Sequence, residues 1–132
     1  MKRRNIYPEE HWKLEVDISW TMGIHCGDMI VLNAQGDFAP DGRVLEPGEI
    51  VAQTRTSMDN IRKVLAEFGL GLQDILKLNS FYRVGTVEEF LENLAVRSSY
   101  FERPGPAVVG LPVDTLSYED MMIEIEAIAM GG

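Results

Sequence analysis

The stretch Ile123-Glu124-Ile125-Glu126-Ala127-Ile128-Ala129, close to the end of the chain, carries the clearest structural signal in the sequence. Apolar and polar side chains alternate with a period of two, which is typical of a β-strand with two different faces. One face is expected to carry Ile123, Ile125, Ala127 and Ala129. The other is expected to carry Glu124, Glu126 and Ile128, flanked by Met122 and Met130. Two carboxylates thus share a face with large apolar side chains, so we expect that face to be only partly solvated.

A carboxylate beside apolar surface tends to have a raised pKa, and a raised pKa suits proton transfer near neutral pH. Glu124 and Glu126 are therefore candidates for acid–base work. The same alternation also occurs on ordinary solvated sheet faces, which are the commoner case. The pattern alone favours that simpler interpretation.

Periodicity elsewhere predicts a single α+β domain over residues 1–132 with the order β-β-β-α-β-α-β-β. Strands are expected over 14–20, 22–26, 29–35 and 75–84, near Val108 and over 121–130. Helices are expected over 48–68 and from the capping box Thr86-Val87-Glu88-Glu89 to about Phe101. The second helix is expected to pack through Val87, Phe90, Leu91, Leu94 and Phe101. Ala39-Pro40-Asp41-Gly42 reads as a turn, and both helices are expected on one face of one mixed sheet.

Charge and composition exclude several classes of partner. The net charge of -9 argues against nucleic acid, because phosphate binding needs a basic surface. The short basic run Lys2-Arg3-Arg4 is interpreted as a solvated terminus without a following signal segment. No stretch has the roughly 18 apolar residues of a membrane span. One cysteine excludes an internal disulfide, and His11, His25 and Cys26 show no metal-ligand spacing. We therefore predict a cytoplasmic protein without a metal, cofactor or membrane partner.

Three further segments, in order along the chain, match one known family. They are Gly27–Gln35 (GDMIVLNAQ), Gln53–Ala66 (QTRTSMDNIRKVLA) and Leu72–Lys77 (LQDILK). Together with MIEIEAIAM at the end of the chain, they resemble the RidA/YjgF family of reactive-intermediate deaminases. The resemblance implies a chorismate-mutase-like fold and a homotrimer with a central barrel. It also implies small-molecule clefts between subunits and hydrolysis of enamines or imines, such as 2-aminoacrylate, to 2-oxo acids and ammonia without a cofactor.

The resemblance also implies site residues, beginning with Glu124 as the carboxylate that activates water. Family enzymes anchor the substrate carboxylate with an arginine in a P-x-R-[ST] segment, for which a guanidinium fork is well suited. Aligning Pro104-Gly105-Pro106 on that segment puts Pro106 at the arginine position and Ala107 after it. Aligning Leu111-Pro112 on the family's Leu-Pro puts Arg103 there instead. We favour the first register, in which Arg103 reaches the cleft only from three residues upstream.

Other positions depart from the family as well. Trp20 replaces a tyrosine, Asn33-Ala34 replaces a Ser-Gly pair, and Leu94 replaces an asparagine, whereas Gln35 matches. The leading hypothesis is a branch that lacks the usual arginine and binds a small metabolite, with imine deamination as its reaction class. The alternative is a non-catalytic metabolite-binding or protein-interaction trimer. An Arg103 that faces Glu124 would favour the enzyme, and one that points to solvent would favour the alternative.

Overall fold

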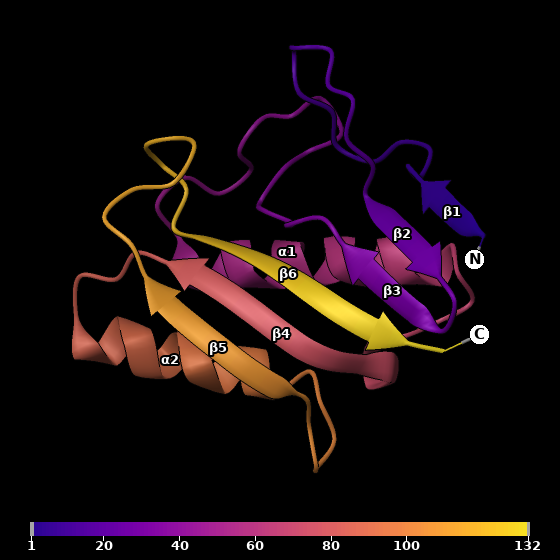
Figure 1. The fold of residues 1–132 in the computed structure, drawn as a ribbon. Helices are drawn as coiled ribbons and strands as arrows, with labels where there is room; N and C mark the ends of the chain where they lie inside the picture. Colours follow the sequence, from indigo (N-terminus) through magenta and orange to yellow (C-terminus); the bar gives the residue numbers. More distant parts are fainter. Residues whose placement is uncertain (1, 132) are drawn as a thin grey trace.

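Six strands form one mixed sheet in the order β1-β2-β3-β6-β4-β5, and two helices lie on one of its faces (Figure 1). The structure is a computed structural model and describes residues 2–131. The strands are β1 Arg3–Ile6, β2 Gly23–Cys26, β3 Met29–Leu32, β4 Ile75–Tyr82, β5 Ala107–Pro112 and β6 Ile123–Met130. The helices are α1 Ile50–Ala66 and α2 Val87–Ser98, with a short 3-10 turn, η1, at Leu72–Asp74. The α+β class and the single mixed sheet are as predicted.

Strand β6 occupies an interior position of the sheet. It pairs antiparallel with β3 on one side and with β4 on the other, while β5 adds parallel to the outer edge of β4. Its side chains alternate as predicted: Ile123, Ile125, Ala127 and Ala129 are each at most 1% exposed. These four residues face the helices, and the intervening residues point to the opposite face.

Helix α1 covers the centre of the sheet with the predicted apolar stripe. Met58, Ile61 and Leu65 are fully buried, because spacings of three and four place them on one side of the helix. The helix stops where Gly69 takes a positive φ of 75° and the Leu70 amide donates to the Leu65 carbonyl. This is the glycine stop expected from the sequence. Within residues 2–131, neither helix has the length and apolar character needed to cross a membrane.

Helix α2 begins as predicted but packs through a different side. The Thr86 hydroxyl accepts a hydrogen bond from the Glu89 amide and so caps the first turn. The buried residues of α2 are Asn93, Val96 and Arg97, whereas Val87 and Leu91 are 68% and 57% exposed. The predicted apolar face was therefore wrong for Val87, Leu91 and Leu94, since most of this helix lies over the edge of the sheet rather than over its centre.

The strand expected over 14–20 is absent, and the first strand lies nearer the N-terminus. β1 pairs antiparallel with β2, so Arg3 and Arg4 belong to the sheet rather than to a solvated terminus. The Arg4 guanidinium lies over the Phe68 ring, 5.4 Å from its centroid. Residues 14–20 alternate in polarity but find no strand partner, and the Lys13 amide bonds to the Pro40 carbonyl instead.

That contact depends on the predicted turn at 39–42. The Gly42 amide donates to the Ala39 carbonyl, and Gly42 has a positive φ of 85°. A Cβ on Gly42 would lie 2.3 Å from the Lys13 carbonyl oxygen, so glycine is required by space as well as by conformation. The turn therefore positions the irregular segment that precedes β2.

Candidate functional site

The sheet face that points away from the helices, here called the open face, is uncovered in a single chain. Strands β3, β5 and β6 contribute its most exposed apolar side chains, which are Met29, Val31, Val109, Leu111 and Met130. These five are 44–49% exposed. Glu124 and Glu126 lie among them on β6. Exposed apolar side chains gathered on one face are typical of surfaces for association or ligand binding.

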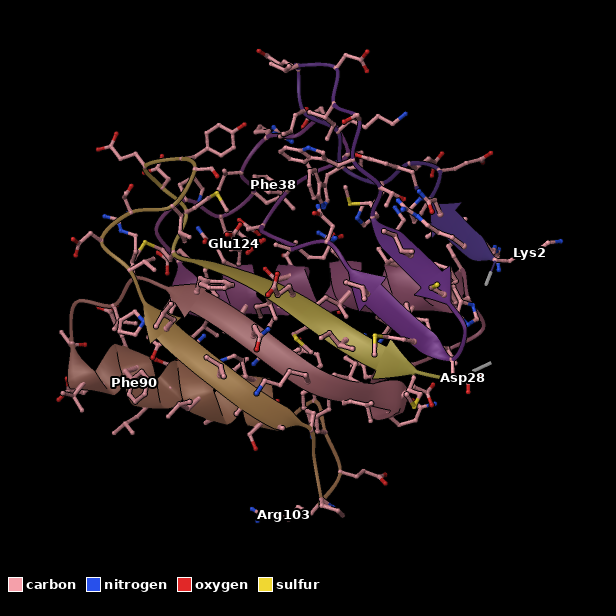
Figure 2. All side chains as sticks on the ribbon, viewed as in Figure 1. Lys2, Asp28, Phe38, Phe90, Arg103 and Glu124 are labelled. Atoms are coloured by element: carbon pink, nitrogen blue, oxygen red, sulfur yellow. The ribbon has the colours of Figure 1, made fainter. Side chains whose placement is uncertain are left out.

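Glu124 and Glu126 have different surroundings although they share the open face. The Asn79 side-chain amide on β4 donates a hydrogen bond of 3.1 Å to Glu126. Glu124 lies opposite Phe81, and its carboxyl group has no hydrogen-bond partner among residues 2–131. Figure 2 shows Glu124 near the start of β6. Glu126 is thus held in place by Asn79, whereas no hydrogen bond within residues 2–131 fixes the Glu124 carboxyl.

Burial raises the pKa of the Glu124 carboxyl, and the nearby negative charge of Glu126 raises it further. Both effects disfavour the ionised form. A carboxyl group in this state can accept and return a proton near neutral pH more readily than an exposed glutamate. The structure therefore agrees with the chemical character expected of Glu124 from the sequence.

The segment Asn33–Gln35 continues from β3 and lies beside the start of β6. Gln35 and Ile125 exchange two backbone hydrogen bonds. The Gln35 side chain is fully buried, where its oxygen accepts from the Trp12 indole at 2.8 Å and lies 2.7 Å from His11 Nε2. The polar atoms of that side chain are therefore occupied within the chain. Its predicted role in ligand binding stays a prediction, and it would act by positioning the neighbouring residues.

Asn33 and Ala34 are partly exposed between the end of β3 and Gln35, which pairs with Ile125 of β6. Trp20 is 57% exposed in the segment that leads into β2. Because β2 begins where β3 ends, Trp20, Asn33 and Ala34 lie toward the end of the sheet where β6 starts. Trp20, Asn33–Gln35 and Glu124 are here called the Glu124 group.

The remaining predicted residues lie at the opposite end of the sheet. Pro106 comes directly before β5, and Ala107 pairs with Lys77, which in turn pairs with Ile128. Ile128 is four residues beyond Glu124, which corresponds to about 13 Å along a strand. Arg103 lies further out, at the exposed tip of the loop before β5 (Figure 2). Arg103, Pro106 and Ala107 are here called the Arg103 group, and one chain does not bring it to Glu124.

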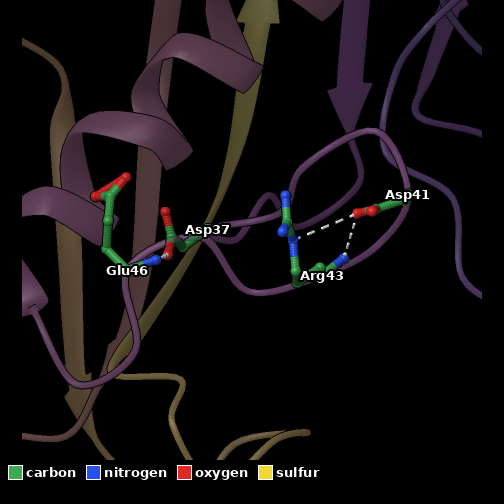
Figure 3. Close-up of polar contacts among 4 residues, drawn as sticks. All are labelled: Asp37, Asp41, Arg43 and Glu46. Atoms are coloured by element: carbon green, nitrogen blue, oxygen red, sulfur yellow. Dashed lines mark hydrogen bonds and ion pairs between the residues drawn. The ribbon is translucent and has the colours of Figure 1, made fainter.

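A buried carboxyl, Asp37, with the partly exposed Glu46 close to it, was not anticipated from the sequence. Asp37 is fully buried, and one of its oxygens accepts a hydrogen bond of 2.6 Å from the Glu46 amide (Figure 3). Burial raises the pKa of Asp37, and partial burial together with the charge of Asp37 raises the pKa of Glu46. The nearby Arg43–Asp41 ion pair is exposed and separate. No group of three potential metal-binding side chains gathers here or elsewhere in residues 2–131.

Arg97 on α2 was also missed. It is 6% exposed, and its Nε and Nη2 atoms are buried without a hydrogen-bond partner within residues 2–131. The available signal was its spacing, because Phe90, Leu94, Arg97 and Phe101 recur at intervals of three and four. A charged residue within an apolar helical stripe indicates either a partner or a ligand.

The architecture and the open face define a chorismate-mutase-like α+β protein with a carboxylate on its last strand. The sequence profile of the family described as Endoribonuclease L-PSP matches residues 12–131. The chain therefore belongs to this family, which is also known as RidA/YjgF, as its motifs predicted.

Individual relatives agree with this assignment. The chain is 32% identical over 115 residues to the 2-iminobutanoate/2-iminopropanoate deaminase of Escherichia coli K12, covering 84% of this chain and 86% of that protein. It is 31% identical to a RutC family protein of Pyrococcus abyssi, covering 83% and 84% of the two chains. The crystal structure of the YjgF gene product of E. coli matches with a TM-score of 0.79 at 30% identity, covering 96% and 98%.

Proposed function

We propose that the protein binds a small metabolite in clefts between subunits of a homotrimer, and that its reaction class is the hydrolysis of imines or enamines. The observation that carries this proposal is Glu124, a partly buried carboxyl with a raised pKa on the open face. The deaminase name of the E. coli relative supports the same reaction class.

The division of the predicted site into two groups supports assembly. The Glu124 group and the Arg103 group lie at opposite ends of one sheet, so a cleft that contains both needs two chains. The open face supplies a reason to associate, because Val31, Val109 and Met130 are apolar and 44–45% exposed. Packing open faces together would bury these side chains and would leave Glu124 at the edge of a subunit interface.

The proposed chemistry is the addition of water to a C=N bond. In the first step the substrate is the protonated imine, and the Glu124 carboxylate takes a proton from water as the water oxygen bonds to the imine carbon and the C=N π electrons move to the nitrogen. In the second step Glu124 gives this proton to the amine of the carbinolamine, and the C–N bond breaks as the C=O bond forms. The hydroxyl proton passes to the departing ammonia, so a 2-oxo acid and an ammonium ion are released. A carboxyl whose pKa lies above its usual range can serve both as the base in the first step and as the acid in the second.

One observation favours a second candidate, a trimer that binds metabolites without catalysis. The Arg103 guanidinium lies at an exposed loop tip away from Glu124, and Pro106 directly precedes β5. Proline has neither charge nor donor with which to hold a substrate carboxylate. Loss of such a charge-assisted hydrogen bond weakens binding by about tenfold or more.

The test couples a lyase that generates 2-aminoacrylate to detection of the pyruvate released. We expect a rate at least about tenfold below that of a family enzyme that carries the arginine. Glu124→Gln preserves shape but cannot act as a base, so it should abolish the remaining rate while the fold persists. Glu126→Gln is the matched control on the same strand and face, and it should reduce the rate less.

The outcomes separate the two candidates. A slow rate that depends on Glu124 supports the deaminase. A complete absence of turnover, with metabolite binding retained, supports the non-catalytic trimer. A full rate in Glu124→Gln, or greater damage from Glu126→Gln, would overturn the role proposed for Glu124.

A further inference from the structure

His11 is a buried titratable residue that the proposed chemistry does not use. It lies in the irregular segment between β1 and β2 and is 1% exposed. Its Nε2 atom lies 2.7 Å from the Gln35 side-chain oxygen, while the Gln35 side-chain nitrogen donates to the Asn33 carbonyl at 2.9 Å. Because Gln35 presents an acceptor to the ring, Nε2 is the nitrogen of His11 that carries the proton and donates it.

The second ring nitrogen of His11 has no such contact. Nδ1 is buried without a hydrogen-bond partner among residues 2–131. In the neutral ring this atom is only an unfilled acceptor, but protonation would place an N–H donor and a positive charge there. A buried donor without an acceptor and a buried charge without a counterion are both costly. The interior therefore accommodates neutral His11 and disfavours its protonated form.

The groups around His11 do not compensate a positive charge. Tyr7 packs edge-on against the imidazole with 6.2 Å between the ring centroids, and the Lys13 ammonium lies over the same Tyr7 ring. Among residues 2–131 no carboxylate forms an ion pair with His11. Burial lowers the pKa of His11, its hydrogen bond with Gln35 opposes this shift, and the charge of Lys63 on α1 adds to it. His11 is therefore protonated only below its ordinary pKa of 6.5.

The backbone around His11 allows this residue to leave the interior. Glu10, directly before it, has a positive φ of 59°, a region that favours glycine over residues with a side chain. Residues 7–22 belong to no strand, and the His11 amide bonds only within its own turn, to the Pro8 carbonyl. This turn can therefore relax without breaking a strand pair.

Gln35 connects His11 to the Glu124 group. Its backbone exchanges two hydrogen bonds with Ile125, the residue after Glu124, and this pairing is an isolated bridge outside the strands. The Gln35 side-chain oxygen is held by Trp12 and His11 together. Removal of His11 from the interior would therefore take away one of the two contacts that anchor this oxygen.

We propose that His11 is a positioning residue of the Glu124 group: neutral His11 holds Gln35 against Ile125, and protonated His11 leaves the interior and loosens this pairing. Because folding lowers the pKa of His11, the stabilisation is present above pH 6.5 and is lost as the pH falls through the folded value. The effect on turnover rests on the proposed function, whereas the movement of Gln35 does not.

The test follows the imidazole signals of His11 and the backbone amide signals of Gln35 and Ile125 by NMR in the intact protein, between pH 8 and pH 5. We expect both amides to change with the midpoint of His11, which should lie below 6.5. The Ile125 amide donates to the Gln35 carbonyl, so its protection from hydrogen exchange should fall about tenfold or more as His11 becomes protonated.

Two variants separate His11 from other titrating groups. His11→Gln can still donate a hydrogen bond to Gln35 but cannot be protonated, so the shared midpoint should disappear. Glu124 titrates in the variant as in the wild type, so its contribution to the Ile125 signal remains. His25→Gln removes the other histidine of the chain and is the matched control, in which the shared midpoint should persist.

The wild-type titration decides the question even if His11→Gln does not fold. The proposal is overturned if His11 titrates at or above pH 6.5, if the two amides do not respond while His11 titrates, or if their midpoint survives in folded His11→Gln. Amides that follow His11 in a protein without imine hydrolysis at any pH would support the role of His11 and count against the deaminase. Hydrolysis that depends on Glu124, with amides that ignore His11, would overturn the role of His11 alone.

Discussion

The two faces of the sheet differ in how far their side chains are buried and hydrogen-bonded within one chain. On β6, Ile123 and Ile125 point to the helices and are fully buried, whereas Met130 points to the open face and is 45% exposed. Polar groups show the same contrast. Gln35, enclosed near Ile125, uses its side-chain oxygen and nitrogen in hydrogen bonds, while Glu124 on the open face has none within residues 2–131. The helix-covered face is therefore packed within one chain, whereas the open face keeps exposed apolar side chains and a carboxyl group without a hydrogen-bond partner among residues 2–131.

The largest effect on the free energy of unfolding is expected from truncating a side chain of β6 that points toward the helices. Ile125→Ala removes a fully buried side chain beneath α1 and should lower the free energy of unfolding by about 2–5 kcal/mol. Urea denaturation measures this loss, which should not vary with protein concentration because the cavity forms within one chain. Ile128→Ala is the matched control on the open face, and its effect should depend on concentration. Equal, concentration-independent losses would show that the two faces do not differ as described.

The next effect concerns the polar junction beside Glu124. Gln35→Leu removes the acceptor of the Trp12 indole N–H and the partner of His11, and both groups are buried. Each unsatisfied group should cost about 1–3 kcal/mol, measurable by urea denaturation. Asn33→Ala is the control, since the Asn33 side-chain amide makes only contacts of 3.5 and 3.9 Å. If Gln35→Leu lowered the free energy of unfolding no more than Asn33→Ala does, the hydrogen bonds of Gln35 with Trp12 and His11 would not hold residues 33–35 in place.

The smallest effect is the pH dependence of stability that arises from Glu124. Because folding raises the pKa of Glu124, the folded state disfavours its ionised form, and stability falls as pH rises from the ordinary value of 4.5 through the folded value. Glu124→Gln removes this penalty. The variant should melt at a higher temperature than the wild type at pH 8 and at nearly the same temperature at pH 4.

Glu15→Gln, in an exposed segment, measures the effect of removing one negative charge from a protein of net charge -9. Thermal unfolding across the pH range should give a smaller and flatter difference for it. A Glu124→Gln variant that gains nothing at pH 8 relative to this control would contradict the raised pKa and with it the contrast between the two faces.

The sequence predicted those elements correctly whose polarity pattern matches a packing or pairing partner in the structure. β6 and α1 alternate as their burial requires, and Gly69 ends α1 as expected. Residues 14–20 alternate equally well, yet no strand pairs with them, because polarity alone does not specify a partner. The burial of α2 differed for a related reason, since a helix at the edge of a sheet is covered on one flank only.

The candidate site was less accessible to sequence reasoning. Motifs identified Glu124 and the two alignments for Arg103, but their separation depends on where β5 joins the sheet. The parallel pairing of β5 with β4 places Arg103 at the far end from Glu124, and no local pattern encodes that pairing. The burial of Arg97 was not predicted for a local reason, because Arg97 lies at the spacing of an ordinary apolar stripe of a helix.

Light scattering at micromolar concentration tests most directly whether the open face is an assembly surface. Each chain has a mass of 14.8 kDa, and the wild type should have the mass of three chains. Val31→Glu places a charge within the apolar part of the open face and should yield single chains that remain folded by circular dichroism. Val16→Glu, at a residue that is 71% exposed outside the sheet, should remain trimeric. A wild type that has the mass of one chain, or a Val31→Glu variant that stays trimeric, would contradict the account.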